Sequence, residues 1–223
     1  MNKKDRKEIY PFIDNRITDY CSEMHSNTNE SLNELIRLTH LRFVKPHMVS
    51  GAWQGAFLQM ICRILRPKRI LEIGTFSGYA TLCFALSTTE DCRIDTVEAM
   101  REYEDFLSSV FERNGVKDKI RLHFGQGLEV IETLEDKYDL IFIDAEKIHY
   151  PQYYDLCVQR LNKGGILLAD NILWYGKVAL TSQKDKETEA IREFNEKITA
   201  DERMDNLILP IRDGIMVGRK KDY

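Results

Sequence analysis

The sequence predicts an α/β fold, with a doubly wound, Rossmann-like and mostly parallel sheet that follows a set of N-terminal helices and ends in an antiparallel hairpin. Two observations predict this class. From Arg69 onward, short apolar runs alternate with stretches of helical periodicity, which is typical of parallel strands covered by helices on both faces. Near the end of the chain this alternation stops, and Arg212-Asp213-Gly214 separates two apolar runs as a hairpin turn does.

The N-terminal part of the chain, residues 1–68, is predicted to be helical because its apolar residues recur every three to four positions. Three such groups are Ile9, Ile13, Ile17 and Tyr20, then Leu32, Leu35, Ile36, Thr39 and Phe43, and finally Phe57, Leu58, Ile61, Ile64 and Leu65. Pro67 ends the third group, and residues 45–51, which include Pro and Gly, are predicted to form a loop.

The remaining elements follow in order along the chain. Five apolar runs are predicted as strands, at 70–73, 94–97, 120–123, 140–143 and 165–169. Helical patterns between them include Tyr103, Phe106, Leu107 and Val110, and also Tyr154, Cys157, Val158 and Leu161. A charged helix over 185–200, with Ile191, Phe194 and Ile198 inside, precedes the hairpin strands 207–209 and 215–218. No repeat or linker interrupts this order, which predicts one domain over 1–223, with 1–68 as an extension of the core 69–223.

Composition narrows the function classes. Over 223 residues, 30% are charged and 43% hydrophobic, an ordinary globular balance, and the net charge of −4 does not suggest a polybasic nucleic-acid binder. No apolar stretch is long enough to span a membrane, and the start lacks a signal core. The five scattered cysteines contain no C-x-x-C pair, which fits reduced thiols in a cytoplasmic protein.

Acidic residues and glycines at strand ends predict a nucleotide-like cofactor site. Glu72 and Gly74 end the first strand, Gly78 opens a helix, and Glu98 ends the second strand, where a carboxylate suits the hydroxyls of a ribose. Glu72 stands where a dinucleotide fingerprint needs glycine, and a carboxylate there favours the ammonium of S-adenosylmethionine over a pyrophosphate. The plainer interpretation is a turn whose glycines only end strands, with Glu98 on the surface.

Oxygen-bearing residues end the next two strands. Asp144 follows the fourth run, and Asp170 and Asn171 follow the fifth, so they are expected in the crevice at the strand ends. Two carboxylates and an amide suit a hard divalent cation such as Mg²⁺, Mn²⁺ or Ca²⁺. Lys147 is expected to face the same crevice, where a dication would lower its pKa and make it a general base. The alternatives are that these acids and Asn171 cap turns or a helix, and that Lys147 is a solvated surface residue.

Trp174, Tyr175 and Arg212 are candidate walls of an acceptor pocket, although an aromatic pair in a loop also serves to pack that loop over the core. The five histidines show no metal-ligand spacing and are assigned no chemistry.

Three motifs together resemble the metal-dependent O-methyltransferases of the caffeoyl-CoA and catechol O-methyltransferase group, including its bacterial members. They are Leu71-Glu72-Ile73-Gly74-Thr75-Phe76-Ser77-Gly78-Tyr79, Phe142-Ile143-Asp144-Ala145-Glu146-Lys147, and the segment from Ala169 to Val178. The resemblance implies a class I methyltransferase sheet of seven strands with the last one antiparallel, a homodimer, and a hydroxylated small-molecule acceptor.

The resemblance also implies roles for individual residues. It assigns contacts with S-adenosylmethionine to Val49, Ser50, Glu72, Gly74, Thr75, Gly78, Glu98, Gln126, Gly127, Asp144 and Glu146. The metal would bind Asp144, Asp170 and Asn171, with Mg²⁺ the first expectation, and Lys147 would help to deprotonate the acceptor. Met48, Trp174, Tyr175 and Arg212 would contact that acceptor.

The chain departs from the family pattern at three positions. Ala80 replaces a serine that holds the cofactor carboxylate, so Thr81 or a backbone N–H would take its place. Gln126 replaces a common aspartate at the adenine, and Arg212 replaces a frequent glycine before Asp-Gly. The change at Arg212 places a cation near the acceptor and leaves the identity of that acceptor open.

The main alternative is a methyltransferase that acts on hydroxylated uridine in tRNA. Basic runs at the two ends of the chain offer a local patch for RNA: Lys3, Lys4, Arg6 and Lys7, then Arg219, Lys220 and Lys221. A nicotinamide-binding oxidoreductase or a non-catalytic cofactor-binding module fits the motifs less well.

Overall fold

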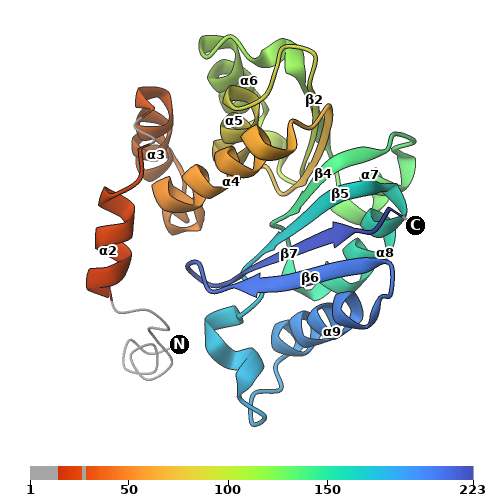
Figure 1. Cartoon of the computed structure of the whole chain (residues 1–223). Coiled ribbons are helices and arrows are strands. Elements are labelled where there is room, and N and C mark those ends of the chain that lie inside the picture. The colour runs from red at the N-terminus through yellow and green to blue at the C-terminus, as the bar shows by residue number, and fades with distance from the viewer. Residues whose placement is uncertain (1–14, 27–28, 223) are drawn as a thin grey trace. The chain divides into compact units, whose positions relative to one another are not determined.

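The computed structural model describes residues 15–26 and 29–222 (Figure 1). Ile9 and Ile13 of the first predicted helix, and the basic run at Lys3–Lys7, lie outside these residues. The chain divides into two compact units. We call Met24–Tyr138 the central unit, and the segment ending at Glu23 together with Asp139–Tyr223 the terminal unit.

The central unit contains three parallel strands in the order β3-β2-β1, with helices between them. Its strands are β1 (Arg69–Ile73), β2 (Arg93–Glu98) and β3 (Ile120–Phe124). Its helices are α3 (Glu30–Arg42), α4 (Gly51–Leu65), α5 (Tyr79–Leu86), α6 (Glu104–Arg113) and α7 (Gly127–Thr133). Residues 70–73, 94–97 and 120–123 are thus strands, as predicted.

The terminal unit contains the other strands in the order β4-β5-β7-β6, and β7 is antiparallel to both of its neighbours. They are β4 (Tyr138–Ile143), β5 (Leu161–Asp170), β6 (Met204–Leu209) and β7 (Ile215–Lys220). The helices are α2 (Asn15–Glu23), α8 (Tyr150–Arg160) and α9 (Lys186–Ala200), and α9 packs against α8 and β6. The seven strands make the mixed sheet of an α/β fold, as predicted.

The charged C-terminal helix, α9, illustrates why its sequence pattern predicts a helix. Asp185 caps α9 by accepting the backbone N–H of Thr188, and acidic residues fill the first turn. Ile191, Phe194 and Ile198 are fully buried, so one apolar stripe attaches an otherwise polar helix.

Two boundaries differ from expectation. The predicted loop at 45–51 contains a short 3₁₀ helix, η1 (Pro46–Met48), because Pro46 has the backbone φ that a first helical position requires. Leu161 was assigned to a helix by its spacing but begins β5, where it is buried. Periodicity alone does not separate the last apolar residue of a helix from the first of a strand.

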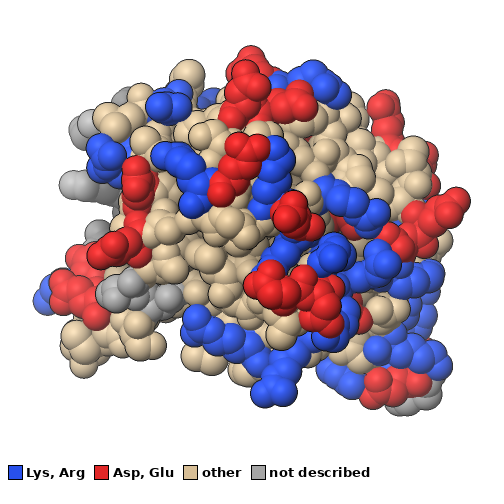
Figure 2. All heavy atoms as spheres, turned by 90° about the horizontal axis from the view of Figure 1, so that it is seen from above, with Lys and Arg blue, Asp and Glu red and all other residues tan. Residues whose placement is uncertain are grey.

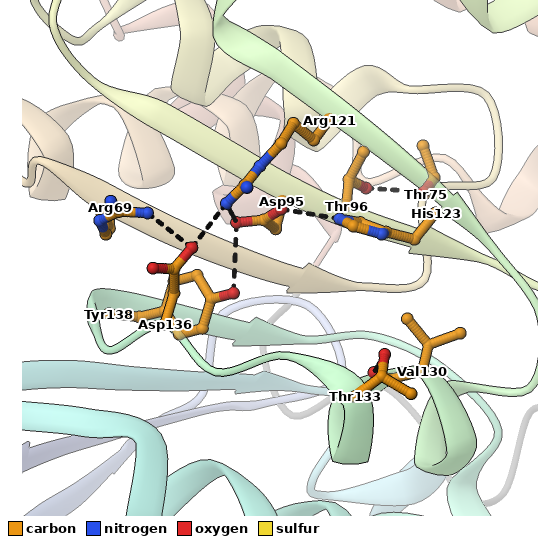
Figure 3. A network of polar contacts seen from close by, with 10 residues as sticks. All are labelled: Arg69, Thr75, Asp95, Thr96, Arg121, His123, Val130, Thr133, Asp136 and Tyr138. Carbon is orange, nitrogen blue, oxygen red and sulfur yellow. Dashed lines mark hydrogen bonds and ion pairs between the residues drawn. The ribbon is translucent and has the colours of Figure 1, made fainter.

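A polar network lies across the strands of the central unit (Figure 3). The buried carboxylate of Asp95 in β2 accepts hydrogen bonds from Arg121 (2.8 Å) and Tyr138 (3.2 Å), and lies 2.7 Å from His123 Nε2. Asp136 joins Arg121 on its exposed side, at 2.7 Å. Burial alone would raise the pKa of Asp95, but the hydrogen bonds from His123 and Arg121 hold it below its usual value.

All five cysteines are free thiols, as predicted. No helix among the described residues has the length and apolar character needed to cross a membrane.

Candidate functional site

Glu72 is the centre of the first group of predicted site residues, which lies in the central unit. It occupies β1, its side chain is fully buried, and its strand-register partner is Thr96 of β2. Thr96 donates a hydrogen bond to Glu72 Oε2 at 2.6 Å, and Thr81 of α5 donates to the same oxygen. Thr81 therefore gives its single hydroxyl proton to Glu72, which leaves a backbone N–H as the expected donor to a cofactor carboxylate.

The turn after β1 needs its two glycines. Gly74 has a φ of +102°, a conformation that favours glycine, and its N–H donates to Val97 O at 3.0 Å. Gly78 has a φ of +79° and begins α5, and a Cβ there would lie 3.0 Å from Leu107 Cδ2. Gly78 therefore lets the loop pack closely on α6 as well as opening the helix, so its packing role is independent of any ligand.

Glu98 ends β2 and is 7% exposed. Its Oε2 accepts the N–H of Phe76 at 2.7 Å, and its Oε1 accepts the N–H of Met100 at 2.9 Å. Burial raises the pKa of Glu98, and these backbone bonds partly offset that effect. Because each carboxylate oxygen accepts about two hydrogen bonds, the group is fixed in place and retains capacity for the hydroxyls of a ribose.

The other predicted cofactor residues of this unit lie at helix starts. Val49 and Ser50 are buried just before α4, and Gln126 precedes α7, whose first residue is Gly127. Gly125 N–H donates to Glu98 O at 3.0 Å and so ties the α7 loop to the end of β2. Gln126 is exposed, as is Met48, which was expected to face the acceptor.

Lys147 is the centre of the second group, which lies in the terminal unit. Its side chain is 10% exposed, which excludes the solvated-surface interpretation. Its ammonium donates to Asp144 Oδ1 at 3.0 Å and to the hydroxyl of Tyr150 at 2.7 Å. Tyr150 is fully buried and lies 2.9 Å from the backbone oxygen of Asp170, to which its hydroxyl donates. One phenol thus links the lysine at the end of β4 to the end of β5.

The pKa of Lys147 reflects opposing effects. Burial would lower it, but Tyr150, Asp144 and Asp170 more than offset burial, and the pKa is raised above its ordinary value. The sequence predicts a lowered pKa for Lys147 only beside a bound dication, and that expectation stays a prediction.

Asp170 and Asn171 form a compact turn at the end of β5. The backbone N–H of Asn171 donates to Asp170 Oδ1 at 2.8 Å, and Asn171 has a φ of +60°, a conformation that asparagine tolerates better than most residues. Within the described residues, no three His, Cys, Asp or Glu side chains are grouped to hold a metal. The predicted set has two carboxylates and one amide, and all three carry the oxygen donors that Mg²⁺ prefers.

The predicted acceptor walls share an unusual backbone. Trp174, Tyr175 and Arg212 all have a φ between +46° and +59°, in the left-handed region that bulky residues rarely adopt. The Trp174 and Tyr175 rings lie 5.2 Å apart, and Tyr175 N–H donates to Asp213 Oδ1 at 2.6 Å. Such backbone conformations are strained and cluster at functional sites, and the acceptor contacts of these residues stay a prediction.

Glu146 does not join the Lys147 cluster. It is exposed and lies 3.5 Å from His149 in an ion-pair geometry, and its predicted contact with the cofactor stays a prediction.

Three residues of these groups were not predicted. Tyr150 follows Lys147 by three positions, a helical spacing that offered a weak signal, and Thr96 is a strand neighbour of Glu72 only through the register. Arg192 of α9 donates to the backbone oxygens of Lys177, Val178, Leu180 and Gln183, at 2.5 to 3.0 Å. Arg192 therefore holds the segment that follows Trp174 and Tyr175, and no local sequence motif predicts this role.

The chain is similar to known proteins over nearly all of its length. Residues 22–221 match the family model described as O-methyltransferase. A probable caffeoyl-CoA O-methyltransferase of Dictyostelium discoideum is 32% identical over 214 residues, which cover 93% of each chain.

Solved structures show the same fold. The methyltransferase PaMTH1 of Podospora anserina, bound to SAH, has a TM-score of 0.86 and 30% identity, covering 96% of this chain and 98% of its own. An O-methyltransferase of Bacillus cereus in complex with SAH has a TM-score of 0.85 and 27% identity, covering 92% and 97%. The match over nearly all of the sequence, together with the acidic residues at the strand ends, shows that this chain belongs to the O-methyltransferase family.

Proposed function

We propose that this protein transfers the methyl group of S-adenosylmethionine to one of two adjacent hydroxyls of a small, catechol-like acceptor, with the help of a divalent cation. The observation that carries the proposal is the buried ammonium of Lys147, held between Asp144 and Tyr150 beside the end of β5. A buried lysine among oxygen donors is expensive to maintain, and such perturbed groups mark functional sites more often than chance does.

The central unit would hold the cofactor. S-adenosylmethionine supplies a methyl group on a sulfonium and carries both an ammonium and a ribose. Glu72, held by two hydroxyls, fits the ammonium, and Glu98, fixed by two backbone N–H groups, fits the ribose. Related structures with bound SAH or SAM, at 25–30% identity, support this choice.

The terminal unit would hold the cation and the acceptor. Asp144, Asp170 and Asn171 would bind the cation, with Mg²⁺ expected first and Mn²⁺ or Ca²⁺ as alternatives. A bound dication lowers the pKa of a hydroxyl that it ligates. Trp174 and Tyr175 would orient the acceptor ring, and the exposed Arg212 would lie near its entrance.

Lys147 would move the proton. When its amine is neutral, Nζ takes the proton from the acceptor hydroxyl, while Tyr150 keeps Nζ in place. The acceptor oxygen then uses its freed electron pair to form a bond to the methyl carbon as the carbon–sulfur bond breaks. Positioning of the two reactants would account for much of the acceleration.

A methyl-transfer assay tests this proposal. Wild-type protein is offered a vicinal diphenol and the matching monophenol, with and without EDTA, and then with Mg²⁺, Mn²⁺ or Ca²⁺ restored. Methylation of the diphenol alone, lost in EDTA and recovered with a cation, is expected. Full activity in EDTA would exclude the metal role.

Asp170→Ala separates methyl transfer from cofactor binding. It should abolish methyl transfer while leaving SAH affinity within about twofold, because its role lies with the cation and acceptor. Asp155→Ala is the matched control, since Asp155 is an exposed acid of α8 paired with Lys197 at 2.6 Å. A fully active Asp170→Ala protein would contradict the assignment.

A tRNA acceptor serves as a comparison arm of the same assay. On the face shown in Figure 2, Lys and Arg gather toward the lower right with Asp and Glu among them, so both signs of charge are mixed there. Such a mixture does not favour a polyanionic acceptor over a small one. The expected homodimer stays a prediction, and light scattering measures it.

A further inference from the structure

A relay of threonine hydroxyls ends at the carboxylate of Glu72. Thr96 donates to Glu72 Oε2 at 2.6 Å, and Thr81 donates to the same oxygen. Thr75 and Thr96 lie 2.6 Å apart through their hydroxyl oxygens (Figure 3). All four side chains are at least 97% buried. No motif of the family resemblance assigns a role to Thr96.

The direction of this relay follows from proton counting. A hydroxyl has one proton to donate, and an ionised carboxylate only accepts. Because Thr96 gives its proton to Glu72, the bond between Thr75 and Thr96 must have Thr75 as the donor. Thr75 is itself fixed by its backbone N–H, which donates to Val97 O at 3.2 Å. The relay therefore runs from Thr75 to Thr96 to Glu72.

The hydrogen bonds of the relay favour one charge state of Glu72 over the other. Burial by itself favours the neutral form of a carboxyl group, which would not attract an ammonium. Two hydroxyl donors on one oxygen favour the anion and also fix its orientation. Both donors meet at Oε2, and a carboxylate has about four acceptor sites on its two oxygens, so capacity for a ligand remains.

We propose that Thr81 and Thr96, the latter supported by Thr75, are positioning residues that hold Glu72 as an oriented anion for the ammonium of the cofactor's amino-acid part. This inference rests on the proposed cofactor. It makes affinity for the ammonium, rather than for the adenosine part, depend on the hydroxyls of Thr81 and Thr96, whose protons are donated to Glu72.

Two ligands separate this role from general support of the site. SAH carries the ammonium, whereas 5′-methylthioadenosine has the same adenosine and sulfur without the amino-acid part. Calorimetric titration of the full chain with each ligand measures both affinities. Thr96→Val and Thr81→Val keep the branched shape and remove the hydroxyl. Each should weaken SAH about tenfold or more and change methylthioadenosine less than about twofold.

Two further variants complete the experiment. Thr88→Val is the matched control, because its hydroxyl donates to Phe84 O at the end of α5 and does not contact Glu72. Thr96→Ser keeps the donor and should retain SAH affinity within about twofold. It also keeps the test available if Thr96→Val does not fold.

The outcomes are distinct. Selective loss of SAH affinity with rescue by serine supports the relay. Equal weakening of both ligands, no weakening of either, or failure of Thr96→Ser to rescue would overturn it. Wild-type protein that binds neither ligand would refute the proposed cofactor, and with it this role, whereas wild-type binding with unselective variants refutes the relay alone.

Discussion

Replacing Asp95 by asparagine tests how much a single buried carboxylate contributes to the central unit. Asp95 has a side chain 1% exposed and holds His123, Arg121 and Tyr138 across β2, β3 and the start of β4 (Figure 3). Asparagine has nearly the same shape, so packing is preserved while the charge is removed and one acceptor oxygen becomes an NH2 donor. The same Arg121 also meets Asp136 at 2.7 Å, where the carboxylate side chain is 35% exposed. Asp136→Asn is therefore the matched control.

The expected magnitudes differ because of burial. A hydrogen bond to a charged group contributes about 1.5–3 kcal/mol. The bond to Arg121 is discounted because that side chain is 52% exposed and water replaces part of the interaction. We expect Asp95→Asn to lower the free energy of unfolding by about 2–3 kcal/mol, or roughly 5–10 °C in Tm for a chain of this length. Asp136→Asn should cost at most about 1 kcal/mol.

Thermal unfolding followed by circular dichroism at several pH values measures both variants. The pKa of Asp95 is lower in the folded protein than in the unfolded chain. Its stabilisation is therefore present above the unfolded value of about 3.9 and is lost as the pH falls through the folded value. The difference in Tm between wild type and Asp95→Asn should persist from pH 7 to 5 and narrow below about pH 4. Equal Tm values for wild type and Asp95→Asn at pH 7, or equal losses for the two variants, would refute this reasoning.

Three other outcomes are expected. Arg192→Gln removes the guanidinium donors that hold the backbone at 177–183. In hydrogen-exchange mass spectrometry, this segment should therefore exchange its amide hydrogens faster, while the remaining helices keep their protection. Leu58→Ala opens a cavity at a fully buried position of α4 and should cost about 2.7–5 kcal/mol in denaturant unfolding, with an unchanged m-value. A thiol reagent at pH 8 should label Cys21 first, because the other four cysteines are buried and burial raises the pKa of Cys62 to about 12. Chemical denaturation should then expose all five thiols to the reagent. Rapid labelling of more than one thiol in the native protein would contradict this expectation.

Strand ends were the part of the candidate site that could be predicted. Glu98, Asp144 and Asp170 each follow an apolar run, and the structure places them at or just beyond the end of a strand, while Glu72 is the penultimate residue of β1. This worked because continuous apolar strands alternating with helices specify parallel pairing, and parallel strands present their carboxyl ends at one edge.

The boundaries of helices and strands were harder to predict where a helical and a strand periodicity meet. Leu161 fits the apolar face of α8 and also the first buried position of β5. The antiparallel hairpin was predicted from Asp213-Gly214, but its insertion with β7 between β5 and β6 depends on long-range pairing that no local pattern encodes.

The sequence by itself determined the α/β class, the order of the elements, and the residue types at the ends of the strands, because hydrophobic periodicity and turn chemistry are local properties. The tertiary structure decided which side chains share a hydrogen bond. Thr96 reaches Glu72 from 24 positions away, and Asp170 meets Tyr150 from 20 positions away. The raised pKa of Lys147 depends on such contacts, since burial and neighbouring charge set the ionisation of a group and only the folded chain supplies them.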